Sequence, residues 1–115
     1  MRDLTMIRDR YLQDQLPVRM GGLAANLARV HSFATDLANQ EVVFGLLDES
    51  KHFIEWTAVE AEVETAAQLV ELQVQLALWQ LEWNTLWPDS ERRERMATES
   101  RAWSDRVLQL SGLID

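Results

Sequence analysis

Glu49 and His52 form a Glu-x-x-His pair, the spacing that places a carboxylate and an imidazole on one helical face in di-iron carboxylate bundles. A complete site of that type needs a second Glu-x-x-His and two further glutamates. The only other histidine is His31, and Ala28 stands three residues before it. The second half of the motif is therefore missing. We expect both histidines to fill boundary positions, and we keep a metal-binding bundle that uses Glu49 and His52 as the least favoured alternative.

The sequence contains five tryptophans, which could line a pocket for a flat apolar ligand such as a tetrapyrrole. Trp79, Trp83 and Trp87 recur at intervals of four residues, and Trp103 lies in the next predicted helix. Aromatic side chains also dominate protein cores and interfaces, so packing explains these four more simply. A small-molecule-binding helical bundle is therefore the main alternative to an interaction protein.

No other residue pattern indicates catalysis. The absence of cysteine excludes disulfides, thiolate metal sites and cysteine nucleophiles. No serine has the sequence context of a nucleophile elbow, and no carboxylate pair has an evident polar pocket around it. The basic cluster at residues 92–95 is interrupted by Glu94 and is typical of a solvated helix start. We expect a non-enzymatic protein without a cofactor.

The formal net charge of −8 lies almost entirely in residues 41–87, where Lys51 is the only base among nine acids. A surface of this sign repels phosphate backbones, so we expect no nucleic-acid partner. The other ten basic residues are arginines in the flanking segments, and we expect some of them to pair with the central acids. Apolar runs such as residues 42–47 are too short to span a bilayer, and the first residues do not resemble a signal peptide. These features predict a cytoplasmic protein without a membrane partner.

Residues 49–87 contain neither proline nor glycine and end against Pro88. They predict one very long helix of about 58 Å at 1.5 Å per residue. Other helices are predicted at about 3–14, 17–38 and 90–111, with a turn near Asn39, within a single domain that covers residues 1–115. The predicted fold is all-α, an antiparallel helical bundle built on the long central helix.

The predicted long helix has two apolar faces, whereas a surface helix needs one. Its neighbours, at roughly twenty residues and about 30 Å each, are too short to cover both faces. We therefore predict a homodimer in which two long helices pack antiparallel. A monomer whose N-terminal segment covers the second face is the competing arrangement, and the pattern does not show which face forms the interface. The candidate interface residues are Val63, Val70, Val74 and Leu81 on one face, and Leu72, Leu76, Trp79 and Trp83 on the other.

Residues 21–28 are unusually small, with Gly21, Gly22 and three alanines in a helical pattern. Glycine in a helix interior costs about 1 kcal/mol relative to alanine, so close approach of another backbone should compensate. We expect this contact with the small residues Ala58, Ala61 and Thr65 of the long helix. A glycine-rich ligand loop is the alternative, although no phosphate-loop pattern follows.

The stretches LPVRMGGLAANLARVHSF, DESKHFIEW and WSDRVLQLSGL resemble a family of small, uncharacterised all-helical proteins of cyanobacteria. The resemblance covers most of the chain. It implies a cytoplasmic protein of a photosynthetic bacterium, and it implies no activity, cofactor or catalytic residue. Together with the residue patterns, it leads us to expect a homodimeric interaction or scaffold protein that could also bind another protein.

Overall fold

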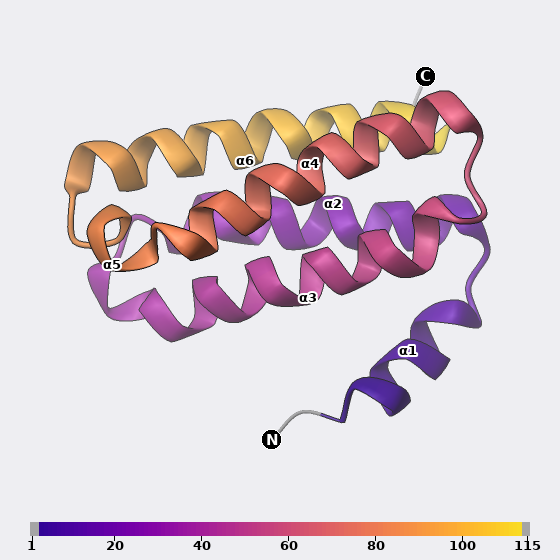
Figure 1. Ribbon diagram of the computed structural model, residues 1–115, viewed down its shortest axis with the longest axis horizontal. Helices are drawn as coiled ribbons and strands as arrows, with labels where there is room; N and C mark the ends of the chain where they lie inside the picture. The colour runs from indigo at the N-terminus through magenta and orange to yellow at the C-terminus, as the bar shows by residue number, and fades with distance from the viewer. Residues whose placement is uncertain (1–2, 114–115) are drawn as a thin grey trace.

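Four long helices, α2, α3, α4 and α6, run along one another and enclose a common apolar core (Figure 1). This computed structural model describes residues 3–113, and within that range all regular structure is helical. A short helix, α1, packs against α3 as a separate arm. The elements are α1 (Leu4–Leu12), α2 (Leu16–Phe33), the 3₁₀ turn η1 (Leu37–Asn39), α3 (Gln40–Ala58), α4 (Val63–Leu81), α5 (Trp83–Leu86) and α6 (Ser90–Ser111).

Local signals place the ends of α6 where the sequence predicts them. The carboxylate of Asp89 accepts hydrogen bonds from the backbone N–H groups of Glu91 and Arg92, at 3.0 and 3.2 Å. This N-cap satisfies donors that the first helical turn leaves free. At the other end, Gly112 adopts φ 78°, the left-handed conformation that glycine tolerates best. The turn near Asn39 is also confirmed, because η1 ends there and α3 follows directly.

Residues 49–87 do not form one helix, so the prediction of a single very long central helix is wrong. α3 ends at Ala58, residues 59–62 form a turn, and α4 starts at Val63. A second break at Glu82 separates α4 from α5. The turn at 59–62 reverses the chain, and α4 returns along α3 (Figure 1).

Burial of apolar side chains explains why the chain bends. Leu69, Leu72 and Leu76 are completely buried because α4 folds back onto the other helices. Burying a leucine side chain contributes roughly 1.5–3 kcal/mol. Intrinsic helix preferences of ordinary residues differ by less than about 1 kcal/mol each. Tertiary packing therefore overrides a local preference for a continuous helix.

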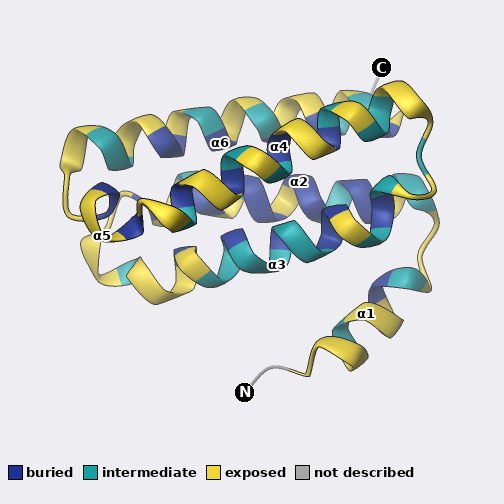
Figure 2. Ribbon diagram, in the orientation of Figure 1, coloured by how far each residue is buried: buried dark blue, intermediate teal, exposed yellow. Residues whose placement is uncertain are grey.

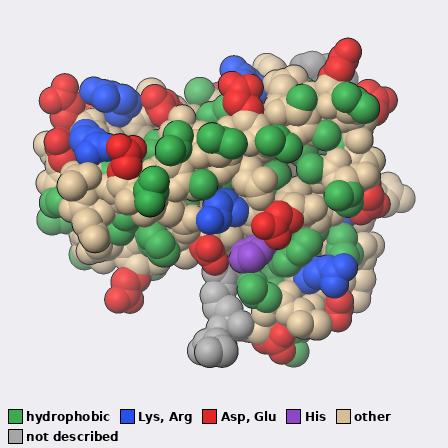
Figure 3. Space-filling view, viewed as in Figure 1, with side chains coloured by type: hydrophobic (Ala, Val, Ile, Leu, Met, Phe, Trp, Pro, Cys, Tyr) green, Lys and Arg blue, Asp and Glu red, His purple; other side chains and the backbone are tan. Residues whose placement is uncertain are grey.

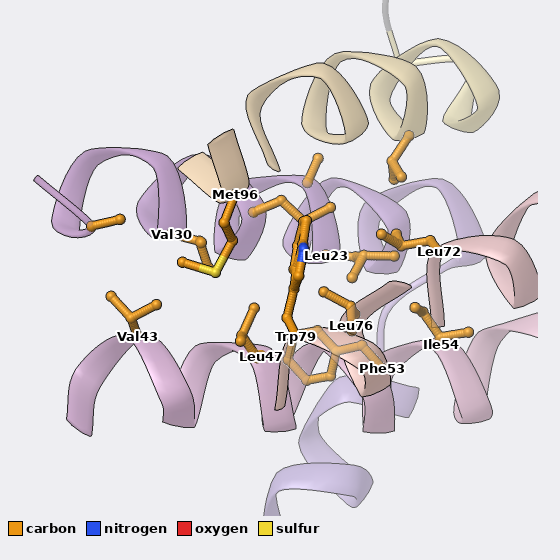
Figure 4. Close-up of a cluster of buried hydrophobic side chains, with 14 of the residues drawn as sticks. Leu23, Val30, Val43, Leu47, Phe53, Ile54, Leu72, Leu76, Trp79 and Met96 are labelled. Atoms are coloured by element: carbon orange, nitrogen blue, oxygen red, sulfur yellow. The ribbon is translucent and has the colours of Figure 1, made fainter. Parts of the chain in front are cut away.

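One chain covers one of the two apolar faces that were candidates for the dimer interface. Leu72, Leu76, Trp79 and Trp83 are all buried in the core of the same chain. Figure 4 shows Trp79 and Leu76 pointing toward side chains of α2, α3 and α6. A straight helix would have been too long for its neighbours to cover both faces, and the bend brings α4 back over the core of its own chain.

The predicted close approach of another helix is found at Ala24, which packs against α6, but not at the glycines, where an added Cβ would meet the side chains of Leu113 (Gly21) and Tyr11 (Gly22). The Ser104 hydroxyl of α6 donates a 2.7 Å hydrogen bond to the Ala24 carbonyl of α2, and Ala97 and Ser100 are buried nearby in α6. α2 also packs against α3, which ends at Ala58, whereas Ala61 lies in the following turn and Thr65 in α4. Residues 21–28 are continuous helix, so they do not form a glycine-rich ligand loop.

Candidate functional site

The outward side of α4 carries an exposed apolar stripe, which we call the outer α4 face. Val63 and Leu81, at its two ends, are 85 % and 82 % exposed. Figure 2 shows the exposed residues of α4 on the side turned to the viewer, and Figure 3 shows hydrophobic side chains in a diagonal band over the same helix. The outer α4 face consists of Val63, Ala67, Val70, Val74, Ala77 and Leu81.

The outer α4 face has the spacing of a coiled-coil seam and lies opposite the buried side of the same helix. Its residues follow one another at alternating intervals of four and three, the spacing of a coiled-coil seam. The stripe extends over about 27 Å at 1.5 Å per residue. The opposite side of α4 holds the fully buried residues Leu69, Leu72 and Leu76. α4 is therefore packed on its inner side and uncovered on its outer side.

The borders of the outer α4 face are acidic or neutral. No lysine or arginine occurs between Lys51 and Arg92. Glu82, beyond the C-terminal end of the stripe, forms an ion pair of 3.3 Å with Arg92. Glu64 and Glu71 flank the stripe and have no ion-pair partner among residues 3–113. A partner on this face therefore meets apolar side chains bordered by negative charge.

An open groove of about 600 Å³ continues the outer α4 face at its C-terminal end. The Phe44 and Trp83 rings lie along it in an edge-to-face arrangement with centroids 5.3 Å apart. Leu81 belongs to both the groove and the outer α4 face. The full lining is Gln40, Glu41, Phe44, Gly45, Gln80, Leu81, Trp83 and Asn84.

The structure divides the eight candidate interface residues into two groups. Leu72, Leu76, Trp79 and Trp83 lie in the core, where a partner cannot reach most of their surface. Val63, Val70, Val74 and Leu81 are exposed on the outer α4 face. Of the two apolar faces found in the sequence, the valine-rich one is therefore available to a partner.

The Glu49–His52 pair does not form a metal centre with other residues. The Glu49 carboxylate accepts a 3.1 Å hydrogen bond from the Asn26 amide. His52 instead lies 3.7 Å from Asp48 and 3.6 Å from Glu55, and its ring stacks against Trp56. Within residues 3–113, no group of three or more potential ligands is close enough to hold a metal ion.

His31 connects two helices. Its Nδ1 atom lies 2.9 Å from the Ala97 carbonyl oxygen in α6. A carbonyl can only accept a hydrogen bond, so Nδ1 carries the proton and His31 donates. This contact supports packing of α2 on α6 and agrees with the predicted boundary role.

Three of the four tryptophans that could line a ligand pocket, Trp79, Trp83 and Trp87, are buried in the core, and Trp103 packs against it. Trp83 and Trp87 stack with ring centroids 5.0 Å apart, and the Trp87 indole donates a 3.1 Å hydrogen bond to the Leu37 carbonyl. Trp103 lies under the guanidinium of Arg106, at 4.4 Å, and contacts no other tryptophan ring in the described part of the chain. Packing in the core therefore accounts for Trp83 and Trp87.

A buried polar cluster lies where α1, α2 and α3 meet, and it was not predicted from the sequence. The Tyr11 hydroxyl donates a 2.7 Å hydrogen bond to the Arg19 carbonyl, so the Thr57 hydroxyl, 3.1 Å away, donates to the Tyr11 oxygen. Burial raises the pKa of Tyr11 to about 12. The Arg19 guanidinium donates to the Trp56 carbonyl at 3.3 Å and to the Glu60 carboxylate at 2.7 Å.

The ion pair between Arg19 and Glu60 shifts the pKa values of both groups. The hydrogen bond from Arg19 holds the pKa of Glu60 below its ordinary value, and the same bond raises the pKa of Arg19. The only sequence signal for this pair is the separation of arginines from acids along the chain. The Arg19–Glu60 and Arg92–Glu82 pairs confirm that flanking arginines pair with central acids.

No helix within residues 3–113 has the combined length and apolar character needed to cross a membrane. Comparisons of the chain with protein-family models, curated proteins and solved structures gave no match. The resemblance to a cyanobacterial family therefore remains a prediction.

Proposed function

We propose that the protein is a non-enzymatic interaction protein that forms a homodimer through the outer α4 face. The observation that carries this proposal is an exposed apolar stripe with coiled-coil spacing on a helix whose other side is already buried. Monomeric soluble proteins rarely expose large contiguous apolar patches, and those that do commonly use them for binding. A helix that carries such a stripe pairs with another amphipathic helix.

A second copy is the partner that the pattern favours. In a two-fold dimer the same patch is used on both subunits, so a uniform stripe of valine, alanine and leucine can be complementary to itself. The alanines Ala67 and Ala77 allow close approach of the partner helix between the larger side chains. The acidic borders remain available for a different, basic protein.

The test compares two substitutions at valines of equal exposure. Val70, in the outer α4 face, and Val18, on α2, are 48 % and 49 % exposed. We expect the wild-type protein to sediment as a dimer at micromolar concentration. Val70→Glu places a buried charge on each side of the interface and should weaken the dimer at least about tenfold, whereas Val18→Glu should leave it intact. A monomeric wild type, or equal weakening by both substitutions, contradicts the proposal.

A second candidate function is binding of a flat apolar ligand in the groove beside Phe44 and Trp83. The volume of about 600 Å³ lies in the range of small-molecule sites. Quenching of tryptophan fluorescence by a tetrapyrrole, lost in Phe44→Ala, would favour this function. If no quenching occurs in the wild type, the groove does not bind such ligands.

A further inference from the structure

The turn between α3 and α4 contains no residue that interrupts a helix. Its sequence is Val59, Glu60, Ala61 and Glu62, without proline or glycine. Val59 keeps helical dihedral angles, and the departure from the helix is clear at Glu62, with φ −59° and ψ 153°. The local sequence is therefore compatible with a continuous helix from α3 through residues 59–62 into α4.

A contact from another helix holds the bend. In a continuous helix the Trp56 carbonyl would accept a hydrogen bond from the Glu60 N–H. Here the Glu60 N–H bonds to the Thr57 carbonyl at 3.0 Å instead. The guanidinium of Arg19 donates to the Trp56 carbonyl at 3.3 Å and also binds the Glu60 carboxylate. Arg19 thus replaces a backbone donor at the end of α3.

The apolar pattern continues through the bend even though the helix does not. A straight helix would place Trp56 and Val59 on the same side as the outer α4 face, which begins at Val63. In the bent chain Val59 and Val63 are 84 % and 85 % exposed. The closed chain does not bury either side chain, but both would lie near the midpoint of a straightened helix, where two antiparallel copies would cross.

We propose that α3 and α4 can straighten into one helix and that two copies then exchange residues 63–113. Each core would be completed by α4 and α6 of the partner, through the same contacts that the closed chain makes within itself. Exchange of identical elements is a low-cost route to a dimer, because only the hinge and its immediate contacts change. The exchanged dimer should increase with protein concentration during refolding.

Val63→Pro tests the hinge with little risk to the closed fold. Val63 is the first residue of α4, where proline is favoured because the N–H has no helical partner. The preceding residue, Glu62, already has the extended conformation that proline requires before it. In a straightened helix the same proline would occupy an interior position, where it removes a hydrogen bond and clashes with the preceding turn.

The experiment refolds the full chain at high concentration and separates dimers by gel filtration. All variants carry Val70→Glu, which removes pairing through the outer α4 face. We expect a dimer that persists on dilution, with Val63→Pro lowering its association constant by about 10⁴-fold because proline disfavours a helix interior by about 3 kcal/mol at each of the two hinges. Val63→Ala, the matched control, should retain the dimer. Glu60→Gln, which weakens the contact with Arg19, should increase its yield.

A disulfide identifies the exchange directly, since the chain has no cysteine of its own. Ala24 and Ser104 are in contact between α2 and α6, so Ala24→Cys with Ser104→Cys should link two chains in the exchanged dimer and one chain in the monomer. A covalent dimer on a non-reducing gel supports the proposal. Refolding that yields only monomer, or a dimer with bonds within chains only, overturns it. Neither result bears on pairing through the outer α4 face, which Val70→Glu tests separately.

Discussion

Among residues 3–113, only two ionisable side chains are buried, those of Arg19 and Tyr11. Arg19 is 4 % exposed. Burial of a charge is unfavourable unless it is paired and hydrogen-bonded. The Glu60 carboxylate and the Trp56 carbonyl provide those partners, while the Nε atom of Arg19 has none among the described residues. This arrangement joins α2 to the end of α3 at the position where the chain reverses.

Tyr11 offers a direct test of this polar cluster because it is the only tyrosine in the sequence. Its pKa is raised to about 12 by burial, although the hydrogen bond from Thr57 opposes the shift. The neutral form is favoured in the folded state. Its contribution to stability is therefore complete below the unfolded pKa of about 10 and is lost as the pH rises toward 12. Titration of tyrosinate absorbance in the folded protein should show one transition near pH 12, and a transition near pH 10 would contradict this environment.

α4 carries leucines in two different environments, one side facing the core and the other facing solvent. Leu76 is completely buried and Leu81 is 82 % exposed. Leu76→Ala should destabilise the fold by about 2–5 kcal/mol through lost burial and a cavity. Leu81→Ala should change the free energy of unfolding by less than about 0.5 kcal/mol and should instead weaken the dimer. Urea unfolding at low protein concentration measures the first effect, and sedimentation measures the second. Equal destabilisation by both changes would show that the outer side of α4 is covered within the chain.

The sequence correctly predicted the limits of those helices whose ends are set by neighbouring residues. α6 has an N-cap at Asp89 and a terminating glycine at Gly112, and its predicted and observed limits agree. The two apolar faces of residues 63–83 were also found from helical periodicity. The bend at residues 59–62 was missed because the contacts that accompany it are not local: α4 buries its leucines against other helices, and Arg19, which binds Glu60, lies 41 residues away in the sequence. The sequence could not show which of the two faces is exposed, because the bend decides which one is buried against the other helices.

At the scale of the whole molecule, the formal charge of −8 opposes association of two copies. Added salt shortens the Debye length from about 10 Å at 0.1 M to about 3 Å at 1 M and so screens this repulsion. We expect dimerisation through the outer α4 face to strengthen as the salt concentration rises. Sedimentation at several salt concentrations measures the change. Weaker association at high salt would instead indicate that ion pairs between subunits hold the dimer together.

The packing of α2 against α6 has a consequence for how the protein is made. These two helices form the most extensive contact in the fold, yet Phe33 ends α2 and Ser90 begins α6. At a synthesis rate of roughly 5–20 residues per second, α2 waits several seconds before its main partner leaves the ribosome. During that interval α2 can pack on α3 and α3 on α4, but the side of α2 that contacts α6 has no final partner. That side of α2 therefore remains open until α6 has emerged, and chaperones have their best access to it in that period.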